Sequence, residues 1–424
     1  MDKQKLGDIA TVEISGVDKK TKDGEQEIRL CNFVDVYYNW AITTAQHDGF
    51  MFATARPNEI SKFQLKKGQV ALTKDSETRD DIGVPTYIAD DFDDVILGYH
   101  CALITPNIDF IVGRFVNALL LIDFAMKYFA GISSGSGQRY ALSVEALNSF
   151  PVPMIPLRNQ ERIGEIFSAL DKKIELNRRI NQNLEAMAKQ FYDYWFVQFD
   201  FPNEEGKPYK SSGGKMVWNE KLKRNIPVGW HCGNLFEIAV FTNGLACQKF
   251  RPKDNEVPLP VIKIREMHDG ISVDTEKVTS NIPESVKVYN GDVLFSWSAS
   301  LEVMLWAYGL GGLNQHIFKV TSANDFPKSF YYFQLLDYID VFKKVAEARK
   351  TTMGHITQDH LQQSTIAIPD NKDIAVRFEE LISPIFEQVV KLHEEISYLI
   401  KQRDELLPLL MNGQVSVNSD LSLG

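Results

Sequence analysis

Apolar side chains recur every seven residues along two long segments of this 424-residue chain, at 157–196 and 373–411. A narrow apolar seam of this kind is typical of a coiled-coil helix. One helix cannot bury its own seam, so each segment needs a partner, and their similar lengths favour pairing with each other. The predicted seam residues are Ile163, Leu170, Ile174, Asn177 and Leu184, followed by Phe378, Ile385, Leu392, Leu399 and Leu406.

Polar residues interrupt both seams. Asn177 and Asn181 fall in the first seam, and Arg403 falls in the second. Buried polar groups in such a seam usually cost stability and fix the register or orientation of the helices. The alternative is that the two helices lie in two separate four-helix bundles. Pairing within the chain is favoured because each helix follows one of two similar halves.

The stretches before the two helices resemble each other. Both contain short apolar runs broken by Gly, Asn, Asp and Lys, which predict strands, and 110–129 predicts an apolar helix. KKGQVAL in the first half is echoed by YNGDVLFS in the second, with 223 residues from Gly68 to Gly291. SFPVP is echoed by TIAIP, with 216 residues from Pro153 to Pro369. Echoes that keep the same order predict an internal duplication.

The expected fold is therefore α+β, with two similar mixed α/β globular domains separated by an antiparallel coiled coil and related by a pseudo-two-fold axis. Aromatic residues cluster at 191–196, either as a partner site or as the floor of the adjoining domain. The predicted parts are a first domain at 1–156, a first helical region at 157–201, a Gly-, Pro- and Lys-rich linker at 202–229, a second domain at 230–370, a second helical region at 371–412 and a flexible tail at 413–424.

Composition limits the class of protein. No stretch reaches the roughly eighteen apolar residues of a membrane span, and the N-terminal residues lack a signal core. Four scattered cysteines predict reduced thiols, no structural zinc and a cytoplasmic location. The net charge of −10 argues against a simple basic nucleic-acid binder, but 157–226 carry 13 basic and 10 acidic residues. A local basic surface can coexist with an acidic total.

Two similar globular heads on a pseudo-two-fold axis match the local symmetry of duplex DNA. Two heads on one face of B-DNA would contact half-sites about 34–36 Å apart, or a multiple of that distance. The sequence therefore favours a double-headed DNA binder.

Three phrases carry a family resemblance that spans essentially the whole chain. They are SFPVPMIPLRNQERIGEIFSALDKKIELNRRINQNLE, FYDYWFVQFDFPNEEGKPYKSSGGKMV and NIPVGWHCGNLFEI. With them the chain resembles the specificity subunit of a type I restriction-modification system. The resemblance implies two target recognition domains, each reading half of a bipartite, asymmetric DNA sequence. It also implies partners, namely two modification subunits that methylate adenine and motor-nuclease restriction subunits. S-adenosylmethionine, ATP and Mg²⁺ would be bound by those partners, and no cofactor by this chain.

The resemblance implies that the chain has no catalytic site, and its motifs agree. It lacks an Asn/Asp-Pro-Pro-Tyr/Phe methyltransferase motif, the Gly-Lys-Ser/Thr of a phosphate loop and a His-Glu-x-x-His metal motif. Two other hypotheses are a coiled-coil adaptor with protein-binding heads and a self-sufficient DNA-modifying enzyme. Divergent loops on duplicated heads weigh against the first, and the missing motifs weigh against the second.

DNA contacts are expected from donor-bearing side chains on loops. The loops around 136–140 and 349–355 are preferred because they occupy equivalent places in the two halves while differing in identity. Solvated turns are the alternative. A second matching pair, Tyr99–His100 and Gln315–His316, favours a shared structural role over base contact. The candidate DNA-binding residues are Lys19, Lys20, Lys22, Lys66, Lys67, Ser136, Gln138, Arg139, Tyr140, Lys249, Arg251, Lys253, Arg349, Lys350, Thr351, Thr352 and His355.

Overall fold

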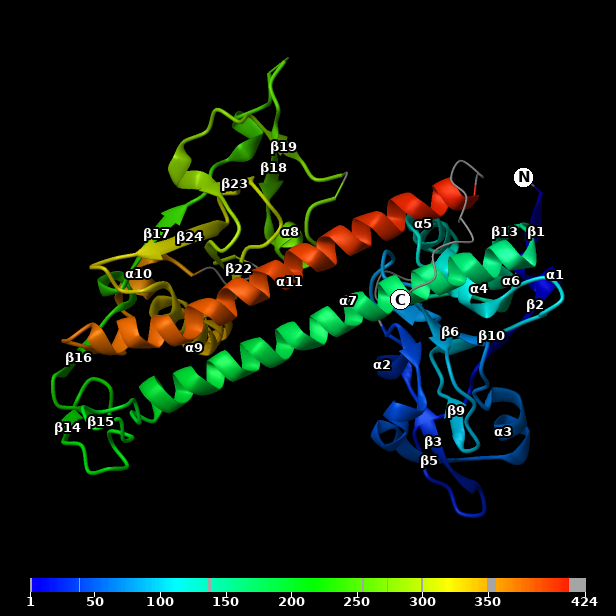
Figure 1. Ribbon diagram of the computed structural model, residues 1–424, viewed down its shortest axis with the longest axis horizontal. Coiled ribbons are helices and arrows are strands. Elements are labelled where there is room, and N and C mark those ends of the chain that lie inside the picture. Colours follow the sequence, from blue (N-terminus) through cyan, green and yellow to red (C-terminus); the bar gives the residue numbers. More distant parts are fainter. Residues whose placement is uncertain are drawn as a thin grey trace. The chain divides into compact units, whose positions relative to one another are not determined.

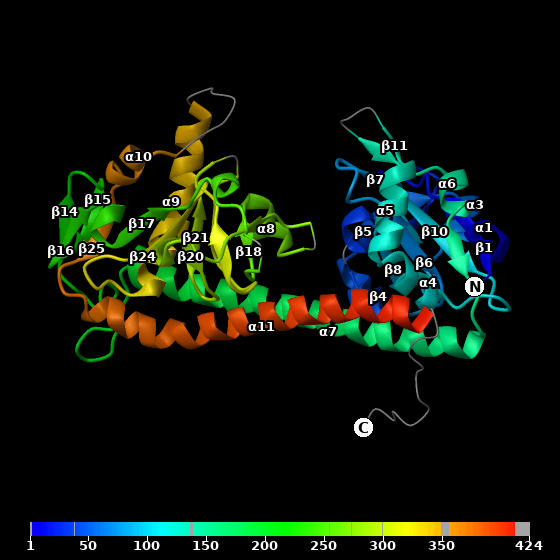
Figure 2. The same ribbon diagram turned by 90° about the horizontal axis from the view of Figure 1, so that it is seen from above.

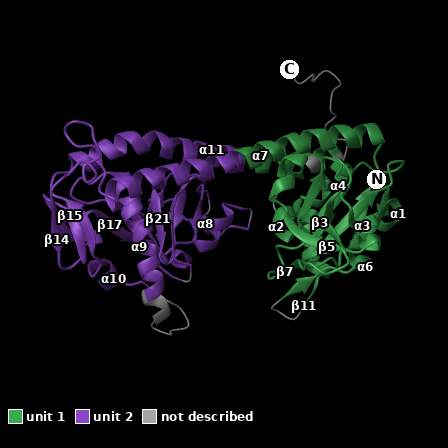
Figure 3. Ribbon diagram, turned by 90° about the horizontal axis from the view of Figure 1, so that it is seen from below, with its two compact units in different colours: residues 1–176, 398–424 green, residues 177–397 purple. Residues whose placement is uncertain are grey.

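A computed structural model describes residues 2–37, 39–135, 139–253, 255–272, 274–298, 300–348 and 356–411. The chain forms two compact units, which Figure 3 shows in different colours. Unit 1 spans Met1–Leu176 and Tyr398–Gly424, and unit 2 spans Asn177–Ser397. Each long helix contributes to both units. The expected tail at 413–424 lies outside the described residues.

The larger sheet of unit 1 has five strands in the order β2-β10-β6-β8-β4, and Figure 1 labels β2, β10 and β6. Neighbouring strands are antiparallel, except that β4 and β8 are parallel. All residues of β6 and β8 are buried, so both faces of this sheet are covered. The strands are β2 (Ala10–Ile14), β4 (Ala41–Ile42), β6 (Val70–Thr73), β8 (Pro85–Ile88) and β10 (Cys101–Pro106).

A smaller sheet of unit 1 has the order β5-β3-β9, with β3 antiparallel to β5 and parallel to β9. Its strands are β3 (Gln26–Cys31), β5 (Met51–Ala55) and β9 (Val95–Leu97). A separate strand pair, β1 (Lys3–Lys5) with β13 (Pro151–Pro153), joins the beginning of the domain to its end. The short helices of unit 1 are α1 (Leu6–Ile9), α2 (Phe33–Val36), α3 (Pro57–Phe63), α4 (Gly113–Leu120), α5 (Asp123–Ile132) and α6 (Val144–Asn148).

The single helix predicted at 110–129 is wrong, because α4 and α5 are two helices that meet at an angle of 73°. Ile122 between them is extended, and its carbonyl accepts the first hydrogen bond of α5, 2.9 Å from the Ala125 nitrogen. Asp123 then lies in the first turn of α5, where a carboxylate is favourable. In the described part of the chain no single helix is long and apolar enough to cross a membrane, although this bent pair meets the criterion when joined.

Unit 2 repeats this arrangement with four strands in each of its two main sheets. Its larger sheet has the antiparallel order β17-β24-β21-β22, and its smaller sheet has the order β19-β18-β23-β20. The strands are β17 (Ala239–Asn243), β18 (Leu259–Ile262), β19 (Lys277–Val278), β20 (Lys287–Val288), β21 (Val293–Ser296), β22 (Glu302–Leu305), β23 (Gly311–Leu313) and β24 (Ile317–Ser322). The helices are α8 (Ile264–Asp269), α9 (Lys328–Ala348), which lies along the larger sheet in Figure 2, and α10 (Gln358–Gln362).

The strand pairings of the two units correspond. The central strand β3 is antiparallel to β5 and parallel to β9, and β18 is likewise antiparallel to β19 and parallel to β23. The strand pair β16 (Trp230–Gly233) with β25 (Ile366–Pro369) takes the place of β1 with β13. Gly68 and Gly291, the echo found in the sequence, both have positive φ angles, of 95° and 84°, which glycine tolerates without strain. The duplicated fold is therefore confirmed.

The two long helices are α7 (Leu157–Tyr192) and α11 (Asp373–Met411), and they run antiparallel within each unit. In unit 1, Asp171 of α7 lies 3.5 Å from Arg403 of α11. In unit 2, Asn177 donates to Glu395 at 2.9 Å, and Asn181 donates to the Val389 carbonyl at 3.4 Å. Of the predicted seam residues, Leu170, Leu184, Ile385, Leu399 and Leu406 are half-buried, and the other five are buried.

The seam ends in the cores of the two units. Phe167 and Leu410 are buried in the core of unit 1, and Phe378 is buried in that of unit 2. Within the aromatic cluster at 191–196, Tyr192, Trp195 and Phe196 are also buried in the core of unit 2. These three rings therefore form the floor of the adjoining domain, one of the two alternatives that the sequence left open.

Residues 202–229 have more structure than the linker that their composition predicted. They contain the antiparallel hairpin of β14 (Met216–Asn219) and β15 (Arg224–Pro227). Ile226 is buried in the core of unit 2, and the Arg224 guanidinium lies 4.4 Å from the Phe199 ring centre. A few apolar residues thus hold a hairpin in this segment, although its many glycines and lysines are typical of a linker. The predicted domain boundaries remain predictions.

Candidate nucleic-acid interface

A small three-stranded sheet forms one end of unit 1. Its order is β11 (Ser134–Gly135), β12 (Tyr140–Ala141) and β7 (Asp75–Ser76). Figures 2 and 3 show β7 and β11 on the side of unit 1 away from the α7 segment of that unit. Tyr140 of the preferred loop therefore pairs with Ser76 of β7, a strand that had not been singled out from the sequence.

Three side chains form a polar cluster at this end. The Lys74 ammonium lies 2.9 and 2.8 Å from the two carboxylate oxygens of Asp75, and Nδ1 of His100 hydrogen-bonds to the same carboxylate. Burial alone would raise the pKa of Asp75, but the hydrogen bonds from Lys74 and His100 outweigh it and lower that pKa below its ordinary value. Asp75 is therefore ionised and holds both partners in place.

The candidate residues nearest this cluster are Arg139 and Tyr140. Arg139 is exposed, and Tyr140 is half-buried with the Arg79 guanidinium 5.2 Å from its ring centre. Such a cation–π contact orders both side chains. This end of unit 1 thus gathers Lys74, Arg79 and Arg139 on neighbouring elements, as a surface that faces phosphates and base edges requires.

Unit 2 has the corresponding end. The Trp297 indole donates to the exposed Asn243 side-chain oxygen at 3.3 Å, and its ring centre lies 5.5 Å from that of His316. Gln315 lies 3.3 Å from Nε2 of the same histidine. The arrangement is aromatic and amide-rich where unit 1 is ionic. The histidines of the Tyr99–His100 and Gln315–His316 pairs thus occupy the same place in both units.

The basic loops predicted to contact DNA also correspond. Lys19, Lys20 and Lys22 lie between β2 and β3, and Lys249, Arg251 and Lys253 lie between β17 and β18. All six are exposed. Two are partly neutralised, because Lys22 lies 3.2 Å from Asp18 and Arg251 lies 3.6 Å from Glu276.

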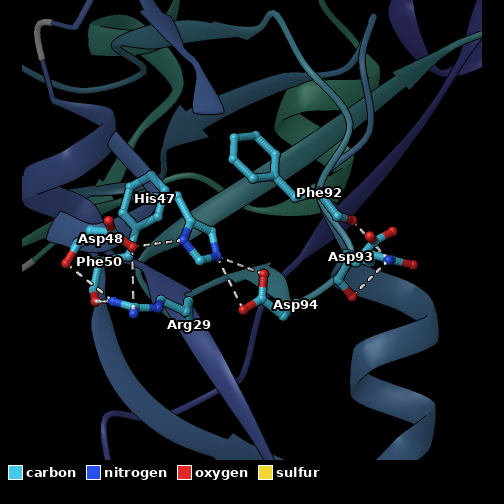
Figure 4. Close-up of polar contacts among 8 residues, drawn as sticks. Arg29, His47, Asp48, Phe50, Phe92, Asp93 and Asp94 are labelled. Atoms are coloured by element: carbon cyan, nitrogen blue, oxygen red, sulfur yellow. Dashed lines mark hydrogen bonds and ion pairs between the residues drawn. The ribbon is translucent and has the colours of Figure 1, made fainter. Parts of the chain in front are cut away.

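Lys66 and Lys67 have acidic surroundings. The Lys67 backbone N–H donates to Asp91 at 3.0 Å. Asp91 also lines a pocket with Asp48, Asp93 and Asp94, and His47 of this pocket bridges Asp48 and Asp94 in Figure 4. This negative field opposes a phosphate close to Lys67, which makes Lys67 the weakest of the described candidates.

The remaining candidates lie outside the described residues. They are Ser136, Gln138, Arg349, Lys350, Thr351, Thr352 and His355. Among the residues that are described, no group of three His, Cys, Asp or Glu side chains is arranged to hold a metal ion.

Sequence reasoning missed Lys74, Asp75, Asn243 and Trp297. A signal was present, because Lys74 and Trp297 stand 223 residues apart, the same offset as Gly68 and Gly291. The two positions hold unlike residues, so a search for similar phrases passed over them.

The chain is similar to known proteins in both sequence and fold. Residues 1–186 match the type I restriction modification DNA specificity domain. The MjaIX specificity subunit of Methanocaldococcus jannaschii is 24% identical over 318 residues, which cover 73% of this chain and 70% of that protein. The HindI specificity subunit of Haemophilus influenzae is 23% identical over 415 residues, which cover 84% and 88%. The crystal structure of a type I restriction-modification S subunit from M. genitalium has the same fold, with a TM-score of 0.53, 11% identity and coverage of 96% and 95%.

Proposed function

Because this chain resembles type I restriction enzyme specificity subunits over most of its length, and residues 1–186 match the DNA specificity domain of that family, we propose that it supplies the sequence specificity of a type I complex. Each unit reads one half of a bipartite, asymmetric DNA target. The observation that carries this is the duplication, in which one strand arrangement presents an ionic end in unit 1 and an aromatic, amide-rich end in unit 2.

The proposal includes partner subunits that do the chemistry. Two modification subunits dock on the helical regions and methylate adenine, and restriction subunits join them. These partners bind S-adenosylmethionine, ATP and Mg²⁺, and this chain supplies no catalytic group. An exposed apolar stripe on α7 supports a docking role, because Leu176, Ile180 and Met187 are 50%, 37% and 39% exposed and share one helical face.

Domain replacement tests the modular reading. Residues 1–156 are replaced by the equivalent domain of a relative with a different target, and the DNA of a host that also expresses the partner subunits is sequenced for methylated bases. One half of the methylated sequence should change and the other half should stay the same. A methylated sequence unchanged in both halves would refute the assignment of one half-site to each unit.

Helix extension tests the proposed spacer. Seven residues are inserted into both helices, after Asn181 in α7 and after Leu392 in α11, which preserves the heptad phase. At about 1.5 Å per residue this adds roughly 10 Å to each helix. The extended protein should change the spacing between the half-sites or lose activity. Methylation of the original sequence at the original rate would show that the helices do not set the spacing.

A further inference from the structure

We propose that Lys74 in unit 1 and Asn243, oriented by Trp297, in unit 2 are the residues that distinguish bases in the two half-sites. Lys74 would select guanine, and Asn243 would select adenine. This inference rests on the proposed function and assigns base readout to specific side chains at the sheet ends described above.

The first argument is that both sheet ends have the same backbone frame. The Lys74 N–H donates to the His100 carbonyl at 2.9 Å, and the Trp297 N–H donates to the His316 carbonyl at 3.3 Å. The Lys74 carbonyl accepts from the Leu142 N–H at 2.8 Å, and the Trp297 carbonyl accepts from the Ile356 N–H at 3.0 Å. Lys74 and Trp297 therefore occupy equivalent positions in the two units.

The second argument is that this frame carries different chemistry in the two units. Position 74 holds an ammonium where position 297 holds an indole. Ile14 and Asn243 also correspond, because Ile14 pairs with Ala102 at the end of β2 and Asn243 pairs with Phe318 at the end of β17. A purely structural role would favour similar residues at corresponding positions, whereas two different half-sites require different ones.

Lys74 suits guanine because it offers only donors. Two of its N–H bonds are directed to Asp75, and His100 holds that carboxylate from the other side. The third N–H remains, and the Lys74 side chain keeps 19% of its exposure. In the major groove, guanine presents two neighbouring acceptors, O6 and N7, and the remaining N–H of Lys74 can donate to either of them.

Asn243 suits adenine because its amide offers a donor and an acceptor together. The indole N–H of Trp297 donates to the Asn243 oxygen at 3.3 Å, which identifies the oxygen side of the amide and leaves one lone pair on that oxygen. Asn243 is exposed at the end of β17. An amide held in this orientation matches N6 and N7 of adenine.

The experiment compares methylated sequences from hosts that express the partner subunits with the wild-type chain, Lys74→Ala or Asn243→Ala. Lys74→Ala should relax a single guanine position in the half-site read by unit 1, and Asn243→Ala a single adenine position in the other half-site. At each relaxed position, methylation of sites with another base should rise at least about fivefold. Trp297→Phe, which keeps the ring but loses the indole N–H, should relax the same adenine position to a smaller extent.

Two controls separate base readout from general damage. Lys127→Ala removes an exposed lysine that pairs with Asp123 in unit 1, and Asn225→Ala removes an exposed strand asparagine in unit 2. Both should leave the methylated sequence unchanged. If Lys74→Ala reduces the yield of the assembled complex, Lys74→Gln, which can still hydrogen-bond to Asp75, replaces it and should relax the same position.

The outcomes are distinct. If the wild-type chain directs methylation of a bipartite sequence and the Lys74 and Asn243 variants methylate that same sequence with the same frequencies, this inference is wrong and the proposed function stands. If the wild-type chain directs no bipartite methylation, the proposed function itself fails.

Discussion

The two units share a backbone frame but differ in what the frame presents. In unit 1 the sheet end holds the ion cluster of Lys74, Asp75 and His100, and in unit 2 it holds Trp297 with its ring tilted against that of His316. The frame is maintained by backbone hydrogen bonds, which every residue except proline can make. Side chains at these positions can therefore diverge without loss of the fold, as the proposed recognition of two different half-sites requires.

The units also differ in how they hold the long helices. Unit 2 surrounds Phe378 of α11 with rings, including Phe196 at 4.9 Å and Trp195 at 5.5 Å between ring centres. Unit 1 combines buried apolar residues such as Phe167 with the ion pair between Asp171 and Arg403. The anchor of unit 2 thus combines a cluster of rings with the hydrogen bonds of Asn177 and Asn181, whereas that of unit 1 includes the ion pair between Asp171 and Arg403.

The largest effects are expected from Phe378→Ala and Phe167→Ala. Both side chains are fully buried, so each substitution should lower the free energy of unfolding of its own unit by about 3–5 kcal/mol. All tryptophans except Trp40 lie in unit 2, so tryptophan fluorescence follows unit 2 and circular dichroism follows both units. Phe378→Ala should shift the fluorescence transition, and Phe167→Ala should not.

Val376→Ala is the matched control for these two variants, because Val376 lies on α11 with 44% exposure and should cost little. Equal fluorescence shifts for Phe378→Ala and Phe167→Ala would show that the two units unfold as one. The comparison of two separately anchored units would then fail.

A smaller effect is expected from Arg403→Ala. Asp171 and Arg403 keep only 8% and 16% of their side-chain exposure, and the substitution removes the guanidinium that lies 3.5 Å from the buried Asp171 carboxylate. Loss of one partner of a buried ion pair should cost about 3 kcal/mol, while the double variant Asp171→Leu with Arg403→Leu should recover most of that cost. Chemical denaturation followed by circular dichroism measures both variants.

The corresponding change in unit 2, Asn181→Ala, should cost only about 1 kcal/mol, because a single hydrogen bond to the Val389 carbonyl is lost. Lys401→Ala, which removes an exposed lysine 3.9 Å from Glu405 on α11, is the control and should change stability by less than about 0.5 kcal/mol. An Arg403→Ala effect no larger than that of Asn181→Ala would contradict the difference between the two anchors.

The smallest effect concerns pH and His47. Hydrogen bonds to Asp94 and Asp48 raise the pKa of His47 above its ordinary value. A raised pKa stabilises the folded protein below about pH 6.5, and this stabilisation is lost as the pH rises through the folded value. Between pH 6 and pH 8 unit 1 should therefore lose slightly more stability in the wild type than in His47→Gln, as measured by thermal unfolding.

His231 of unit 2 provides the comparison for His47. Burial lowers the pKa of His231, but hydrogen bonds to Asp370 and Glu237 outweigh this and raise it. His231→Gln should reduce the pH dependence of the tryptophan transition in unit 2 and leave that of unit 1 unchanged. Identical pH profiles for the wild type and both variants would contradict the assignment.

The sequence allowed the long-range organisation to be predicted, because helix seams and repeated phrases are patterns of many residues. It did not allow the break at Ile122 or the hairpin at 202–229 to be predicted. Each depends on a few contacts, such as the packing of Arg224 on Phe199. Such contacts produce no repeating pattern of residues in the sequence. The positions that we propose to read bases were missed because the residues there are unlike in the two units. Lys74 and Trp297 correspond in space and hydrogen bonding while sharing no chemical likeness.

The strand pairs β1 with β13 and β16 with β25 place the entry and exit of each globular domain beside each other. The second domain is therefore joined to α7 and α11 by two neighbouring connections, whereas the first domain is joined to α7 by the connection that follows β13. A recombination event with breakpoints in these connections would replace a whole globular domain and leave the long helices unchanged. Under the proposed function, a new target sequence would then arise in a single genetic step rather than by gradual repacking.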